Sequence, residues 1–160
     1  MTHSYNTVSV VGLGYIGLPT AAVIASRKVR VVGVDVNERA VATINRGEVH
    51  IVEPDLDMVV KAAVMGGYLR ATTVPEPADA FLIAVPTPFK EGPLGPYQPD
   101  MDYIQAATKS IAPVLKRGDL VILESTSPVG ATEQMAAWLA EARPDLSFPQ
   151  SRGEASDIRI

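Results

Sequence analysis

Gly12-Leu13-Gly14-Tyr15-Ile16-Gly17 fits the pattern G-x-G-x-x-G, and the residues on both sides of it decide the fold. An apolar run at 8–12 predicts a strand before the turn, and an alanine-rich run at 18–27 predicts a helix after it. A second apolar run at 29–36 carries Asp35, about 20 residues after Gly14. A strand, a glycine turn, a helix and an acid at this spacing form the dinucleotide-binding fingerprint, whereas three glycines alone would be weak evidence.

Each residue type in this stretch has a physical reason. Gly12 permits the tight turn, Gly14 lets the backbone approach a pyrophosphate, and Gly17 lets the helix pack close to the strand. The helix N-terminus offers free N–H groups and partial positive charge to phosphates. Asp35 can accept hydrogen bonds from both ribose hydroxyls and would repel a 2′-phosphate, so NAD is predicted rather than NADP. Arg39, one helical turn later, either stacks near the adenine or is a solvated surface residue. A purely structural glycine turn is the alternative.

The rest of the chain repeats the alternation of apolar strands and helical segments that is typical of a parallel α/β sheet. Further strands are expected at 69–74, 80–85 and 120–123, and further helices at 38–45, 56–64, 104–115 and 131–142. A last apolar segment, 157–160, predicts a sixth strand that has only begun. The predicted fold is α/β, a Rossmann-type doubly wound parallel sheet with helices on both faces and an incomplete sixth strand.

Polar and proline residues predict where these elements begin and end. Asn37 and Asp100 are expected to cap the helices that follow them, and Pro113 is expected to kink its helix. The segment 86–99 contains five prolines, which predict a loop. This loop follows the carboxyl end of a strand, where open α/β sheets place their ligands.

The composition excludes several classes of function. The 160 residues, 47% of them hydrophobic, predict one globular domain over residues 1–160. A net charge of −4 offers no basic surface to nucleic acid, and no apolar run approaches the ~20 residues of a membrane span. No signal peptide is visible, so a cytoplasmic protein is expected. With no cysteine and only His3 and His50, neither a disulfide nor a metal site is expected.

Further motifs follow the glycine turn in the order found in one enzyme family. They are Leu18-Pro19, Gly33-Val34-Asp35, His50-Ile51-Val52-Glu53-Pro54, Val85-Pro86-Thr87-Pro88 and Ser125-Thr126-Ser127-Pro128-Val129-Gly130. With them the chain resembles the UDP-glucose/GDP-mannose dehydrogenase family, from about residue 8 to residue 160. The chain resembles one branch of that family, which acts on UDP-N-acetylhexosamines, at Phe89, Lys90 and Glu124.

The resemblance implies which residues meet NAD. Tyr15 and Ile16 would touch the pyrophosphate through their backbone, and Asp35 would hold the adenine ribose. Thr87, after the fourth strand, and Thr126 or Thr132, after the fifth, would line the nicotinamide side. The alternatives are that Thr132 is only a helix cap and that Thr87 is only a turn residue.

The resemblance also implies a reaction. The family oxidises the C6 alcohol of a UDP-sugar to a carboxylate with two NAD, through an aldehyde that a cysteine captures. That cysteine, the central dimerisation domain and the C-terminal UDP-binding domain are absent from this sequence, so no catalytic residue is expected in the chain. We expect the chain to be one part of a longer enzyme and to be inactive alone. The full-length enzyme is expected to bind a UDP-sugar and to be a homodimer.

Two other functions remain open. The β-hydroxyacid dehydrogenases also begin with a glycine turn, although they generally lack the segments seen here at 85–88 and 125–130. A free-standing dinucleotide-binding or interaction module without catalysis would also keep the turn. The natural sugar nucleotide cannot be predicted, because the sugar pocket lies outside this sequence.

Overall fold

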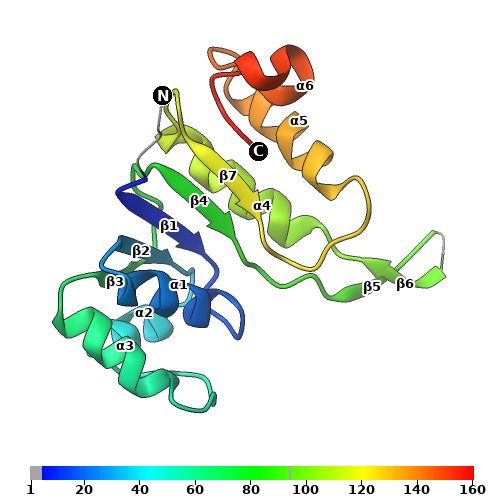
Figure 1. Cartoon of the computed structure of the whole chain (residues 1–160). Coiled ribbons are helices and arrows are strands. Elements are labelled where there is room, and N and C mark those ends of the chain that lie inside the picture. Colours follow the sequence, from blue (N-terminus) through cyan, green and yellow to red (C-terminus); the bar gives the residue numbers. More distant parts are fainter. Residues whose placement is uncertain (1–4, 94) are drawn as a thin grey trace.

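The computed structural model describes residues 5–93 and 95–160, and its centre is a parallel sheet of five strands (Figure 1). The strands lie in the order β3-β2-β1-β4-β7, and every neighbouring pair is parallel. Their bounds are Thr7–Val11 for β1, Arg30–Val34 for β2, Leu69–Thr72 for β3, Ala80–Ile83 for β4 and Leu120–Leu123 for β7. All five predicted strands are present, and only their ends differ from the prediction.

Helices cover both faces of this sheet, as predicted (Figure 1). Their bounds are Gly17–Ser26 for α1, Glu38–Asn45 for α2, Leu56–Met65 for α3, Asp102–Ile111 for α4 and Ala131–Ala142 for α5. Strand residues alternate between two buried layers, so that Val10 packs with α1 and α3 and the next residue, Val11, packs with α4 and α5. Because the sheet is covered on both faces, its strands are mainly apolar, and β4 and β7 are apolar throughout.

The segment 157–160, where a sixth strand was predicted, forms an isolated bridge with the sheet. Arg159 forms a parallel bridge with Leu120 on the outer side of β7, and its carbonyl accepts a hydrogen bond from the N–H of Val121 at 2.8 Å. Between α5 and this bridge lie a short helix, α6 (Pro149–Arg152), and a 3-10 turn (Gly153–Ala155), which were not predicted. The fold is therefore the predicted doubly wound parallel sheet, with one parallel bridge at Arg159 beside its five strands.

The prediction of a loop over 86–99 is wrong, because most of that segment forms an antiparallel hairpin. Its strands are β5 (Phe89–Gly92) and β6 (Gly95–Pro99), and it extends away from the main sheet (Figure 1). The ring of Phe89 meets the ring of Tyr97 edge-on, with centroids 6.2 Å apart. Prolines are tolerated in edge strands, where the missing N–H can face solvent, and a two-stranded hairpin has only edge strands.

Of the three specific predictions about helix caps and kinks, one is confirmed and two are wrong. Asn37 caps α2 through its side chain, as predicted. At α4 the cap residue is Met101, and the carboxylate of Asp100 accepts from the N–H of Asp102 at 3.0 Å. Pro113 does not kink a continuing α-helix, because α4 ends before it and Pro113 lies in a 3-10 turn (Ala112–Val114). Proline lacks the N–H that a further α-helical turn would need.

Candidate functional site

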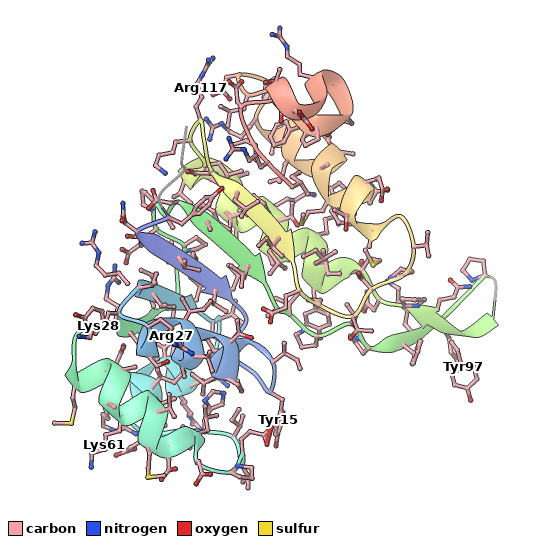
Figure 2. All side chains as sticks on the ribbon, in the orientation of Figure 1. Tyr15, Arg27, Lys28, Lys61, Tyr97 and Arg117 are labelled. Carbon is pink, nitrogen blue, oxygen red and sulfur yellow. The ribbon has the colours of Figure 1, made fainter. Side chains whose placement is uncertain are left out.

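The chain reverses its direction across the sheet between β1 and β4. From β1 it proceeds outward through β2 to β3, and it then returns to β4 and continues to β7 on the other side. Open α/β sheets bind ligands outside the carboxyl ends of their strands at such a switch point. The glycine turn follows β1, and the segment 84–87 follows β4, so both border this crevice. Tyr15 in the turn is 62% exposed and points away from the body of the molecule (Figure 2).

The three glycines of the turn have different surroundings. Gly12 has φ +94°, which side chains rarely adopt, and a Cβ there would lie 2.5 Å from the carbonyl oxygen of Ala84. A Cβ on Gly17 would lie 1.7 Å from the carbonyl oxygen of Gly12. A Cβ on Gly14 would meet no atom within 4 Å. Folding therefore requires the first and third glycines, whereas the middle one leaves open space at the crevice.

Asp35 links the end of β2 to the glycine turn. Its Oδ2 accepts a hydrogen bond from the N–H of Leu13 at 2.9 Å, and its Oδ1 accepts one from the N–H of Asn37 at 2.9 Å. A carboxylate has about four acceptor positions, so two backbone donors leave room for ligand hydroxyls. The same side chain can thus support the turn and receive a ribose.

A cavity of about 570 Å³ opens at the crevice. Its lining consists of residues 11–16, 34–36 and 84–86 together with Thr73, Pro75, Tyr103, Ala106, Ala107 and Ser110. Ligand pockets usually measure roughly 300–1,000 Å³ and are mainly apolar with a few polar groups. Apolar walls suit a base, the carboxylate of Asp35 suits a ribose, and the N-terminus of α1 beside the open space at Gly14 suits a pyrophosphate. The residues present therefore fit NAD.

Five residues predicted to meet NAD do not line this cavity. Gly17 is one of them, and it is buried in the first turn of α1. Thr87 and Thr126 lie together, because the Oγ1 of Thr87 donates to the carbonyl oxygen of Thr126 at 2.5 Å. Thr132 is exposed in the first turn of α5, whose cap residue is Gly130. Arg39 is exposed near the start of α2. The contacts of these five residues with NAD remain predictions, whereas Gly12, residues 14–16 and Asp35 line the cavity.

Sequence analysis missed other residues of the cavity. Thr73 directly follows β3, at the same edge of the sheet, so its place after a strand was a usable signal. Tyr103 and Ser110 stand about two turns apart on one face of α4. The apolar stripe of α4 predicted only the buried face of the helix. It gave no indication of the second, partly polar face that lines the cavity.

A charged network lies at the opposite edge, where the strands begin. Lys116 contacts the carboxylates of Asp79 and Asp119. Burial raises the pKa of Asp119, although Lys116 acts against that change. Burial also acts to raise the pKa of Asp79, but the N–H of Thr7, Lys116 and the N–H of Asn6 together hold it below its ordinary value. The network fastens the start of β1, β4 and β7, and it leaves the carboxyl edge to a ligand.

Within residues 5–93 and 95–160, no three acidic or histidine side chains gather in a group that could hold a metal ion. None of the helices in that part of the chain is both long and apolar enough to cross a bilayer. His3 lies outside the described residues.

Comparison with known proteins shows which family and which relatives the chain is similar to. Residues 6–158 match the model of the NAD binding domain of the UDP-glucose/GDP-mannose dehydrogenase family. The chain is 74% identical to UDP-N-acetyl-D-mannosamine dehydrogenase from Yersinia pestis over 98% of its length. It is 70% identical to NDP-N-acetyl-D-galactosaminuronic acid dehydrogenase from Ralstonia nicotianae, again over 98% of its length. It covers 36% of the length of each of these relatives.

A solved structure agrees with these sequence matches. The UDP-N-acetyl-mannosamine dehydrogenase from Staphylococcus aureus aligns with 95% of the chain at a TM-score of 0.84 and 34% identity. The chain covers 34% of that protein. Together these findings confirm the resemblance inferred from the motifs. They also confirm the likeness to UDP-N-acetyl-D-mannosamine dehydrogenase that Phe89, Lys90 and Glu124 indicated.

Proposed function

The chain belongs to the UDP-glucose/GDP-mannose dehydrogenase family as its NAD-binding domain, and from this membership we propose that the whole enzyme oxidises UDP-N-acetyl-D-mannosamine at C6. The relative from Yersinia pestis supports the choice of substrate through its 74% identity. The observation that carries the proposal is the glycine turn beside Asp35 at the 570 Å³ cavity. Family membership disfavours a β-hydroxyacid dehydrogenase. It also disfavours a binding module without catalysis.

The proposed reaction converts a primary alcohol to a carboxylate. One alcohol, one water and two NAD give one carboxylate, two NADH and three protons. NAD supplies an acceptor for each hydride that leaves C6. The first loss gives an aldehyde, and we propose that a thiol of the whole enzyme captures it before the second loss, so that water then releases the carboxylate.

The part of this chain in the reaction is to bind and orient NAD. The backbone of residues 14–16 meets the pyrophosphate, and Asp35 accepts from the adenine ribose. Thr87 and Thr126 hold the nicotinamide side near the place where C6 must arrive. The chain has no cysteine to capture an aldehyde, so we propose that it turns over no sugar nucleotide alone.

The identity of the sugar is a second question within the proposal. A relative with 70% identity is named for NDP-N-acetyl-D-galactosaminuronic acid, which is close to the 74% of the mannosamine enzyme. Both names contain an N-acetylated hexose, so the class of substrate is better supported than its stereochemistry. A galactosamine nucleotide is therefore the second candidate substrate.

The proposed partners of the whole enzyme are a UDP-sugar and a second copy of itself in the cytoplasm. Nucleic acid is not among them, since the chain has a net charge of −4. Light scattering on the full-length enzyme should give the mass of a homodimer, and a monomer at working concentration would contradict that part of the proposal.

The proposed function can be tested on two levels. Calorimetric titration of this chain should show NAD binding without any turnover. The full-length enzyme should release two NADH for each UDP-N-acetyl-D-mannosamine, measured by absorbance. Oxidation of only the galactosamine nucleotide would refute the choice of sugar, and one NADH per sugar would refute oxidation to the carboxylate.

A further inference from the structure

Thr20 and Glu124 join two parts of the NAD site that are far apart in the sequence. The Oγ1 of Thr20 donates a hydrogen bond to the Oε1 of Glu124 at 2.7 Å. Thr20 lies in the first turn of α1, the helix whose N-terminus faces the open space at Gly14. Glu124 directly follows β7 and precedes the loop 125–130, which carries Thr126. The hydrogen bond therefore runs from the pyrophosphate helix to the nicotinamide-side loop.

Other hydrogen bonds fasten this loop to the end of β4. The Oγ of Ser125 donates to the carbonyl oxygen of Val85 at 2.8 Å. The backbone N–H of Ser125 donates to the carbonyl oxygen of Ile83 at 3.1 Å. Thr87 adds the bond to the carbonyl oxygen of Thr126. The segments after β4 and β7 thus form one unit. Across the described ranges of the chain, the bond from Thr20 is the one side-chain hydrogen bond between α1 and this unit.

Glu124 has acceptor capacity that folding does not use. Its Oε2 is buried and accepts no hydrogen bond from any described residue. A buried carboxylate oxygen without a hydrogen-bond donor destabilises the folded state. A glutamate is therefore an unfavourable residue for a purely structural hydrogen bond to α1. Buried polar groups of this kind call for a reason other than stability, and functional sites are one place where they are kept.

We propose that Thr20 and Glu124 are positioning residues of the NAD site. Their bond sets the separation between α1 and the loop 125–130, so that one NAD molecule reaches the helix N-terminus and Thr126 at once. The inference rests on the proposed contacts of NAD with both loops. Without the hydrogen bond, the loop 125–130 no longer holds the nicotinamide half of NAD in position. The glycine turn and Asp35 still bind the ADP-ribose half.

The test compares NAD with ADP-ribose, which lacks the nicotinamide, by calorimetric titration of this chain. The variants Thr20→Ser and Thr20→Ala differ by one hydroxyl, and alanine suits a helix, so both should fold. In Thr20→Ala, NAD should bind about fivefold more weakly, the factor that one net hydrogen bond represents. Its affinity for ADP-ribose should not change, and Thr20→Ser should bind NAD as the unaltered chain does. Ser26→Ala is the control, since this α1 hydroxyl donates within its own helix, and it should alter neither affinity.

The possible outcomes separate positioning from a structural role. An equal loss of affinity for both ligands in Thr20→Ala would show general damage and would overturn the proposal. Unchanged NAD binding in Thr20→Ala would overturn it as well, and so would equal affinity of the unaltered chain for NAD and ADP-ribose. Failure of the unaltered chain to bind either ligand would instead refute the proposed function, on which the positioning role depends.

Discussion

The two halves of the NAD site are built by opposite means. Around the glycine turn, the structure depends on side chains that are missing: Gly12 and Gly17 leave space that neighbouring backbone occupies. Around the loops after β4 and β7, it depends on small hydroxyls that are present, in Thr20, Thr87 and Ser125. A substitution in the first half adds atoms where none fit, whereas one in the second half removes a single bond. The first half should therefore be far less tolerant of change.

Gly17→Ala should cause the largest loss of stability. The added Cβ would lie 1.7 Å from the carbonyl oxygen of Gly12, which belongs to the turn itself and cannot move without opening it. We expect the free energy of unfolding to fall by roughly 4 kcal/mol or more, the size that marks severe steric damage. Urea denaturation of the purified chain measures this change.

Gly14→Ala is the matched control, because no atom lies within 4 Å of its added Cβ. Its free energy of unfolding should change by less than about 1 kcal/mol, while its affinity for NAD should fall, since the methyl group enters the space of the pyrophosphate. If the two variants lost equal stability, the distinction between a packing glycine and a ligand glycine would be wrong.

Asp35→Ala should have the next largest effect, on NAD binding. The ribose hydroxyls would lose their acceptor, and each hydrogen bond to a charged group contributes roughly 1.5–3 kcal/mol. The N–H groups of Leu13 and Asn37 would lose their acceptor too. Calorimetry with NAD and NADP measures the affinities, and Asp35→Asn, which keeps one acceptor oxygen, should lose less. If the unaltered chain bound NADP as tightly as NAD, the cofactor assignment would fail.

Thr87→Val should have a smaller effect, because it removes one hydrogen bond and keeps the shape of the side chain. The carbonyl oxygen of Thr126 would lose its donor, and the free energy of unfolding should fall by about 1 kcal/mol. Thr126→Val is the control, since only the backbone of Thr126 takes part in this bond. Equal losses in the two variants would show that the Thr87 hydroxyl is not what holds the loops together.

This contrast also explains what could be predicted from the sequence. The glycine turn was predictable because the requirement for a missing side chain acts over a few residues, and Asp35 followed at a fixed spacing. The order of strands followed from the alternation of apolar runs and helices. These features depend on local patterns, and local patterns are visible in a single sequence.

The second half depends on contacts between distant residues. Thr20 and Glu124 are 104 residues apart, and in the sequence alone Glu124 indicates only one branch of the family. The hairpin of β5 and β6 could not be predicted, because its prolines indicate a loop and its strands pair with each other and not with the main sheet. Cavity residues such as Tyr103 depend on which face of α4 meets the crevice, and one sequence does not show this.

Acid should weaken the opposite edge of the sheet, where the strands begin, through Asp157, which lies close to the bridge between Arg159 and Leu120. The N–H and hydroxyl of Ser147 donate to its carboxylate at 2.9 and 2.8 Å, and they hold the pKa of Asp157 below its ordinary value of 3.8. A lowered pKa in the folded state adds stability above the ordinary value, and that stability is lost as pH falls below it. The Asp157→Asn variant should be less stable at neutral pH, and the difference should shrink at acid pH. Thermal unfolding at several pH values tests this, and a difference that stayed constant with pH would contradict it.

Lys28→Gly should give the smallest effect, and it should be a gain. Lys28, just after the C-terminal end of α1, carries a side chain on a glycine-like backbone with φ 64°, as Asp55 does with φ 61°. Its N–H closes the helix end by donating to the carbonyl oxygen of Ala25 at 2.9 Å, and its side chain lies on the surface (Figure 2). A left-handed backbone destabilises a residue with a side chain by about 1–2 kcal/mol, and glycine avoids this strain. Glycine also loses more conformational entropy on folding, which offsets part of the gain. The free energy of unfolding should therefore rise by about 0.5 kcal/mol. Lys28→Ala keeps the Cβ and removes the charge, so it should gain nothing, and repeated urea denaturation can resolve the difference between the two variants. A gain in Lys28→Ala equal to that in Lys28→Gly would show that the charge of Lys28, and not its backbone conformation, limits the stability of this helix end.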